Sequence, residues 1–223
     1  VKDVRGFYTN RVVPPYLNEA MLLVKEGVNP ALIENAAAKL GLPVGPLALT
    51  DETSLSLGWM LVQSTKKELG DDYKPTGVED LLEKMVEGLG RLGRKSGGGF
   101  YEYPEGGKKY LWPGLSDHFP LADEQPTQED VMERLLYAQL IPAAHCYADD
   151  VVFDPQSADL GAIFGWGFPP YTGGPMSHID TIGVDNFVSK ADSLAQRYGE
   201  RFHPPAKFRD IAKTGDALYK SAA

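Results

Sequence analysis

The chain has 223 residues, of which 43% are hydrophobic and 24% charged, a composition typical of a folded protein with one large or two ordinary domains. Its net charge of −9 and isoelectric point near 4.9 exclude the broad basic surface of a nucleic-acid-binding protein and disfavour an anionic membrane surface. Cys146 is the only cysteine, so we expect no disulfide framework, a reducing (cytoplasmic) compartment, and a buried small residue rather than a nucleophile.

Apolar residues recur at helical spacing in nearly every segment of the chain. In chain order, the predicted helices cover about residues 12–26, 30–40, 46–70, 81–88, 127–141, a segment that opens at Pro155, 184–198 and 205–213. Pro14 and Pro15 belong in the first two turns of their helix, because proline damages a helix interior. Since no convincing strand pattern is present, we predict an all-α fold without a Rossmann domain. No apolar stretch approaches the roughly 20 residues that cross a bilayer.

A turn-rich stretch provides the best domain boundary. Residues 104–126 contain several glycines and prolines and lack a helical period. We therefore predict a first domain over residues 1–104, a linker over 105–126 and a second domain over 127–223.

The two predicted domains share landmarks at a common spacing. Pro175 follows Pro46, and Asp180 follows Asp51, at the same interval of 129 residues, with a glycine before each proline. This repetition indicates two tandem copies of one helical unit. Asp51 and Asp180 are expected to act locally, each accepting N–H groups near the start of its own helix.

Two features that could suggest a cofactor are rejected. Residues 88–93 form a literal G-x-G-x-x-G, but a helix pattern leads into it where a dinucleotide site needs a strand. The four histidines have no metal-ligand spacing, so structural roles are expected for them. We therefore predict no cofactor-binding and no metal-binding residues.

The candidate functional residue is Asn10, which lies in residues 6–11 (G-F-Y-T-N-R) at the start of the first helix. A helix start carries unpaired N–H groups and partial positive charge. An amide held there can donate a hydrogen bond to an oxygen that becomes negative during a reaction. The alternative is that Asn10 merely caps the helix, since asparagine is a favoured N-cap residue.

Several ordered motifs resemble the C-terminal helical domain of 3-hydroxyacyl-CoA dehydrogenases. They are residues 6–11 followed by Pro15-Tyr16, residues 42–46 (L-P-V-G-P) with Asp51, and residues 93–103 (G-R-K-S-G-G-G-F-Y-E-Y). Residues 165–170 (G-W-G-F-P-P), with the glycine–proline turn that ends at Pro175, are similar to the second helical repeat of the multifunctional fatty-acid oxidation enzymes, of the alpha-subunit type.

This resemblance implies a function for the chain. In the family, a Rossmann domain binds NAD and supplies a His–Glu pair, while the helical part closes over the acyl-CoA substrate. Asn10 matches the asparagine of the family motif, which implies contact with the 3-hydroxy or 3-keto end of the substrate. No residues match the His–Glu pair, so the chain is expected to be inactive alone. We expect upstream Rossmann and hydratase/isomerase segments, missing before Val1, and leave open a homo-oligomer.

One departure from the family concerns residues 52–56 (E-T-S-L-S), where the family has a Gly-Leu-Asp-like stretch. It puts the chain-length preference of the acyl pocket in doubt. A function of another class also stays open, namely a non-catalytic helical module for dimerisation or assembly, in which Asn10 is only a cap.

Overall fold

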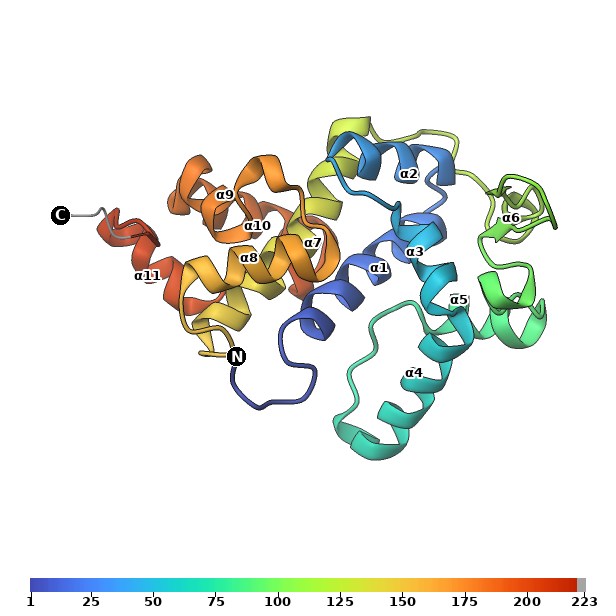
Figure 1. Cartoon of the computed structure of the whole chain (residues 1–223), viewed down its shortest axis with the longest axis horizontal. Helices are drawn as coiled ribbons and strands as arrows, with labels where there is room; N and C mark the ends of the chain where they lie inside the picture. Colours follow the sequence, from blue (N-terminus) through green and yellow to red (C-terminus); the bar gives the residue numbers. More distant parts are fainter. Residues whose placement is uncertain (220–223) are drawn as a thin grey trace. The chain divides into compact units, whose positions relative to one another are not determined.

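The computed structural model describes residues 1–219, and these are mostly helical (Figure 1). They divide into two compact units, which are described separately. The first unit consists of residues 1–16, 39–43 and 132–219, and the second of residues 17–38 and 44–131. These units interleave along the chain and have other boundaries than the three segments expected from the sequence. The units are groups of residues in mutual contact and do not test the expected segments, which remain a prediction.

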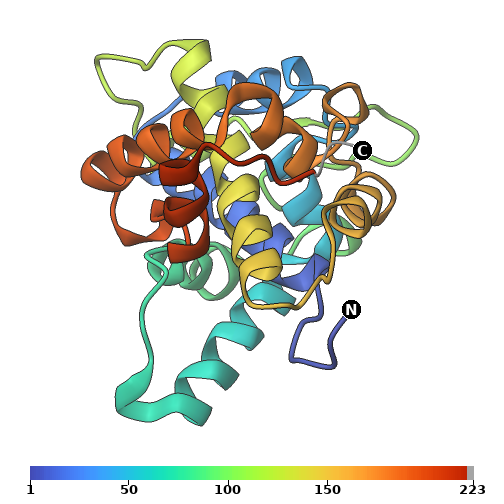
Figure 2. The ribbon, with the colours of Figure 1, turned by 90° about the vertical axis from the view of Figure 1, so that its left-hand side faces the viewer.

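The chain order of the elements is as follows. The α-helices are α1 (Thr9–Lys25), α2 (Pro30–Lys39), α3 (Pro46–Thr53), α4 (Leu55–Leu69), α5 (Glu79–Glu83), α6 (Leu115–His118), α7 (Gln128–Ala148), α8 (Pro155–Trp166), α9 (Pro175–Ile182), α10 (Val184–Tyr198) and α11 (Ala206–Thr214). A π-helical turn η2 (Lys84–Gly88) continues α5, and short 3₁₀ turns are η1 (Gly70–Asp72), η3 (Arg94–Ser96), η4 (Pro170–Thr172) and η5 (Glu200–Phe202). After α11 the described chain continues to residue 219 without a further helix (Figure 2).

The predicted helix starts are confirmed by their caps. The Thr127 hydroxyl accepts the N–H of Asp130 at 3.1 Å before α7, and the Asp154 carboxylate accepts the N–H of Ser157 at 2.7 Å before α8. Each side chain thereby pairs a helix-terminal N–H that would otherwise lack a partner. These starts are local features, which explains why the sequence alone could place them.

The prediction of one helix from Pro46 to Gly70 was wrong, because the chain breaks at Ser54 between α3 and α4. Ser54 has a φ of 80°, a left-handed conformation that no α-helix interior contains. Its hydroxyl accepts the N–H of Leu57 at 3.4 Å and donates to the carbonyl of Leu92 at 3.1 Å. The contact with the distant Leu92 is tertiary, so the helical spacing of the sequence could not reveal the break.

The predicted all-α class describes most of residues 1–219, which also contain one small hairpin. Strands β1 (Tyr101–Glu102) and β2 (Tyr110–Leu111) form an antiparallel pair, with Tyr101 opposite Leu111 and Glu102 opposite Tyr110. Two-residue strands are too short to give a recognisable alternation of apolar and polar residues. This small hairpin joins residues on both sides of the boundary expected at 104.

Arg91 ties this hairpin to the preceding glycine-rich loop. Its guanidinium donates to the carbonyls of Gly99 at 2.6 Å and Tyr101 at 3.0 Å and pairs with Glu102 at 2.9 Å. It also lies 3.9 Å from the ring centroid of Trp112. Arg91 therefore has a structural role, because it joins the hairpin to the glycine-rich loop.

The hydrophobic core of the first unit joins the start of α1 to the C-terminal helices. Tyr8 and Val12 belong to the same buried cluster as residues of α7, α8, α9, α10 and α11, among them Phe187 and Phe208, and as Phe168, which follows α8. The start of α1 is thus part of a core whose other buried residues lie between residues 137 and 218. Within residues 1–219, no helix combines the length and the apolar character needed to cross a bilayer.

Candidate functional site

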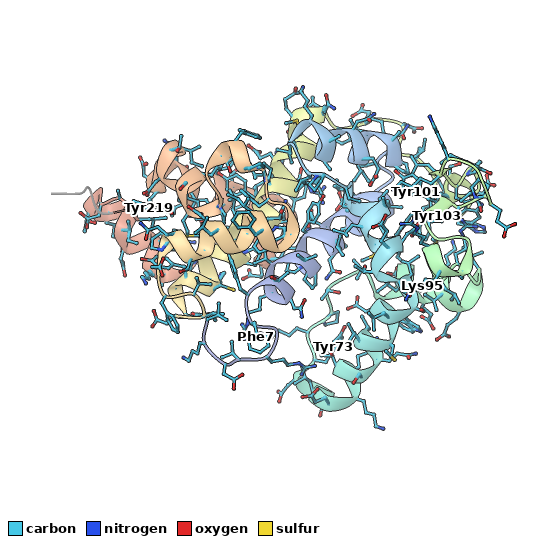
Figure 3. All side chains as sticks on the ribbon, viewed as in Figure 1. Phe7, Tyr73, Lys95, Tyr101, Tyr103 and Tyr219 are labelled. Carbon is cyan, nitrogen blue, oxygen red and sulfur yellow. The ribbon has the colours of Figure 1, made fainter. Side chains whose placement is uncertain are left out.

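The candidate site is the first turn of α1. Phe7, labelled in Figure 3, has a φ of 47°, and the helix begins two residues later at Thr9. The Tyr8 carbonyl accepts the N–H of Arg11 at 3.0 Å, so Tyr8 takes the place of the residue that caps the helix. Asn10 is the second helical residue and is exposed. It therefore does not occupy the N-cap position that the alternative interpretation required.

Tyr8 anchors this turn from the side opposite to solvent. Its side chain is 5% exposed, and its ring meets that of Trp166 edge-on with centroids 5.2 Å apart. Burial, followed by the neighbouring Cys146 and Asp159, raises the pKa of Tyr8, and the described residues offer its hydroxyl no hydrogen-bond partner. The result is a turn with one side chain fixed in the core and the amide of Asn10 directed outward.

The chemistry of such a turn is that of a neutral hydrogen-bond donor. The amide of Asn10 supplies two N–H donors without carrying a charge. It is located where the helix dipole contributes partial positive charge. A donor in this position favours an oxygen on which negative charge develops and cannot itself take up a proton at neutral pH.

The cysteine and the histidines of the first unit serve the structure. Cys146 is buried, as predicted, and burial raises its pKa to about 11, which keeps the thiol protonated and unreactive. His145 lies with its Nε2 3.1 Å from the carbonyl oxygen of His203, and burial lowers the pKa of His178. Over residues 1–219, no group of three or more acidic, histidine or cysteine side chains could hold a metal ion.

Asp51 has a long-range role that differs from the local one expected. It is 1% exposed and accepts the N–H groups of Phe100 at 2.8 Å and Tyr101 at 2.9 Å, together with the hydroxyl of Tyr103 at 3.1 Å (Figure 3). It lies in the sixth position of α3, where it cannot cap the helix start. The prediction of a local contact was wrong because Asp51 binds a segment about 50 residues away.

Asp180 has the corresponding role in the first unit. It is the sixth residue of α9, and its carboxylate accepts the N–H groups of Leu218 at 2.7 Å and Tyr219 at 2.8 Å. The local role expected for Asp180 was therefore also wrong. This carboxylate holds the chain segment that follows α11.

A second carboxylate completes each arrangement. Glu34 accepts the N–H of Leu47 at 2.8 Å and the hydroxyl of Tyr101 at 2.6 Å. Asp159 accepts the N–H of Met176 at 2.6 Å and the hydroxyl of Tyr219 at 2.6 Å. We call each set a carboxylate clasp: Glu34 and Asp51 with Tyr101 in the second unit, and Asp159 and Asp180 with Tyr219 in the first.

Sequence reasoning missed Glu34, Asp159 and Tyr219, although one signal was available. Glu34 and Asp159 are each the fifth residue of a helix that opens with proline, Pro30 and Pro155 respectively. An acidic residue at the same position of two helices with the same start signal could have indicated a shared role. Tyr219 carried no such signal.

Asp51 gives a pH-dependent prediction. Burial raises the pKa of Asp51 to about 6 from its ordinary 3.8, although the hydrogen bonds from Phe100, Tyr101 and Tyr103 lower it. Because the folded protein binds this proton more tightly than the unfolded chain, its contribution to stability is full below pH 3.8 and is lost as the pH rises through about 6. The shift corresponds to about 3 kcal/mol.

The measurement compares the free energy of unfolding of the wild type with that of Asp51→Asn across this pH range. The wild type is expected to lose stability relative to the variant as the pH rises, because the variant has no proton to release at this position. A difference between the two proteins that stays constant with pH would contradict the raised pKa.

A helical segment precedes the glycine motif at residues 88–93, as the sequence indicated. The motif follows the π-helical turn η2 rather than a strand, so no strand-to-helix junction presents helix N–H groups to a pyrophosphate. These residues do not fit NAD.

Comparison with known proteins identifies the class of the domain. Residues 6–103 match the family model described as 3-hydroxyacyl-CoA dehydrogenase, C-terminal domain. This segment contains Asn10 as well as the clasp of Glu34 and Asp51. Residues 6–103 are therefore similar to the C-terminal domain of 3-hydroxyacyl-CoA dehydrogenases, and the resemblance predicted from the motifs is confirmed.

The curated relatives extend the similarity beyond this domain. The chain is 38% identical over 229 residues to the fatty acid oxidation complex subunit alpha of Shewanella halifaxensis (strain HAW-EB4), covering 98% of this chain and 31% of that protein. It is 37% identical over 217 residues to the same subunit of Shewanella baltica (strain OS185), covering 96% of this chain and 30% of that protein. The chain thus spans less than a third of the length of these relatives.

Two solved structures share the fold. The 3-hydroxybutyryl-CoA dehydrogenase of Escherichia coli K12 aligns with a TM-score of 0.68 at 20% identity, over 94% of this chain and 60% of that one. The dehydrogenase part of multifunctional enzyme 1 from C. elegans aligns with a TM-score of 0.69 at 22% identity, over 94% of this chain and 48% of that one. At these identities the similarity establishes the fold alone.

Proposed function

We propose that the chain is the substrate-closing helical part of an NAD-dependent 3-hydroxyacyl-CoA dehydrogenase of fatty-acid β-oxidation. The observation that carries this proposal is the exposed amide of Asn10 on the first turn of α1, inside the segment that matches the family model. The similarity to fatty acid oxidation alpha subunits along nearly the whole chain supports the same pathway.

Asn10 is the residue through which this chain takes part in the reaction. We assign to its amide a hydrogen bond to the oxygen on carbon 3 of the acyl-CoA, on which negative charge accumulates when the proton of the hydroxyl leaves. Such a donor lowers the barrier without exchanging a proton itself. In this proposal NAD accepts the hydride. Residues 88–93 do not fit NAD, and we assign its binding to a separate upstream domain. This chain alone is therefore proposed to be inactive.

The proposal includes two tandem copies of the helical unit. The two carboxylate clasps support it, because in each clasp a tyrosine donates its N–H to one carboxylate and its hydroxyl to the other. The equivalent carboxylates also occupy the fifth and the sixth positions of helices that open with proline. Two unrelated segments would have little reason to repeat this set of atoms.

The partners follow from the same proposal. We infer an acyl-CoA substrate, an upstream Rossmann domain, an upstream hydratase/isomerase segment and a cytoplasmic location. The single cysteine, which is buried and free, supports a reducing compartment.

The experiment replaces the matching segment of the Shewanella halifaxensis alpha subunit by this chain and measures oxidation of a 3-hydroxyacyl-CoA. Asn10→Ala is expected to lower kcat by about 100-fold, with a smaller change in KM, because the hydrogen bond strengthens as charge develops. Asn35→Ala removes another exposed helical asparagine and serves as the matched control. An unchanged kcat in Asn10→Ala would remove Asn10 from catalysis and would favour the assembly-module alternative.

A further inference from the structure

The orientation of Asn10 depends on residues that lie about 150 positions further along the sequence. Asn10 is exposed, while its neighbours Tyr8 and Val12 are 5% and 0% exposed and belong to the core formed with α7, α8, α9, α10 and α11. The first turn of α1 is therefore supported by helices from α7 onward. The matched family segment, residues 6–103, does not contain this support.

Helix α8 approaches this turn through two glycines. A Cβ atom added at Gly161 would lie 3.2 Å from Cδ1 and 3.3 Å from Cε1 of Tyr8. A Cβ atom added at Gly165 would lie 3.1 Å from Oγ1 of Thr9. The two glycines are four residues apart and so lie on the same face of α8. Both separations are tighter than an ordinary contact, so the absence of side chains permits this approach.

The Tyr8 ring is also fixed on a second side. Trp166, the last residue of α8, meets it edge-on at 5.2 Å, and the indole N–H donates to Gln139 at 3.1 Å. Gln139 is 0% exposed and donates in turn to the carbonyl of Leu135 at 3.2 Å. Tyr8 therefore has little freedom to move aside if α8 presents a larger residue.

The backbone before the helix gives a further reason why this packing matters. Phe7 is in the left-handed region with a φ of 47°, a conformation that costs free energy for a residue with a side chain. Such a conformation persists only where the surrounding structure determines it, and here the buried Tyr8 follows immediately. The backbone path of residues 6–10 thus depends on how Tyr8 packs against α8.

We propose that Gly161 and Gly165 of α8 are positioning residues for Asn10, which set the direction of its amide by seating Tyr8 and Thr9. This inference rests on the proposed function of Asn10. A catalytic hydrogen-bond donor must be held within about 0.5 Å of its productive position, so a displacement of a few tenths of an ångström at Tyr8 affects the rate. On this basis the last third of the chain takes part in the reaction of the first copy without touching the substrate.

The first test uses the full chain by itself and follows the side-chain and backbone amide NMR signals of Asn10. Gly161→Ala is expected to shift these signals while the protein remains folded. Gly58→Ala is the matched control, because it also adds a methyl group to a helical glycine, and its nearest neighbour, Cδ2 of Leu82, is 3.8 Å away. Signals that move no more in Gly161→Ala than in Gly58→Ala would overturn the proposal.

The second test is a double-mutant cycle in the Shewanella halifaxensis alpha subunit whose matching segment has been replaced by this chain. Gly161→Ala is expected to lower kcat about 10-fold with KM nearly unchanged, and to have no further effect when Asn10→Ala is already present. Equal losses in both backgrounds would mean that Gly161 acts through general stability, and the positioning role would be rejected. If Asn10→Ala itself left kcat unchanged, both the proposed function and the positioning role in catalysis would fail. If Asn10→Ala lowered kcat and Gly161→Ala did not, only the positioning role would be rejected.

Discussion

Replacing Asp51 by alanine is expected to lower the free energy of unfolding by about 3–5 kcal/mol at neutral pH. The carboxylate accepts two backbone N–H groups and one tyrosine hydroxyl in a position that is 1% exposed. Alanine would leave the N–H groups of Phe100 and Tyr101 buried without their partner, and an unpaired buried polar group loses its full hydration energy. The cost is therefore larger than that of one hydrogen bond.

The measurement is denaturant unfolding of the chain followed by circular dichroism. Asp71→Ala serves as the control, because Asp71 is an exposed carboxylate in η1, and its removal is expected to change stability by less than about 0.5 kcal/mol. Equal midpoints for Asp51→Ala and the wild type would show that residues 98–103 are not held by this carboxylate.

The second large effect is expected for Gly174→Ala, which should cost about 3 kcal/mol or more. Gly174 has a φ of 112°, which disfavours any side chain, and an added Cβ would lie 2.4 Å from Cβ and 2.6 Å from Cα of Asp159. Because the Cα atom belongs to the backbone of α8, the obstruction cannot be relieved by rotating a side chain. The clasp of Asp159 and Asp180 would have to open.

Comparison with two other glycines makes this prediction specific. Gly45→Ala, at the equivalent place in the other clasp, meets only the carboxylate of Glu34 and has a φ of −68°, so a smaller loss is expected because that longer side chain can withdraw. Gly88→Ala meets Lys84 at 3.9 Å and should be nearly neutral. Thermal unfolding of the three variants would contradict the geometry if Gly174→Ala were no less stable than Gly88→Ala.

The carboxylate clasps show how far the sequence could predict this protein. The interval of 129 residues singled out Asp51 and Asp180, which both accept backbone N–H groups of a distant segment, yet these partners were unexpected. In each case the N–H groups that bind the carboxylate belong to a segment between 38 and 50 residues further along the chain. A pattern in the sequence can indicate that two residues correspond, but not which distant backbone they meet.

The same distinction applies to Asn10. Its motif identified the family segment and placed the residue at a helix start, since both depend on neighbouring residues. Nothing in the sequence indicated that Gly161 and Gly165 approach Tyr8 and Thr9, because small residues in a helix have many other causes.

What the sequence determined by itself was the helical class, the helix starts at Thr127 and Asp154, and the family that residues 6–103 resemble. These follow from contacts within one helical turn, or from motifs read in order along the chain. Only the tertiary structure decided the break at Ser54, the hairpin of β1 and β2, and the partners of Asp51 and Asp180. The reason is physical: these features arise where segments distant in sequence pack together, and there buried polar groups must find each other rather than water.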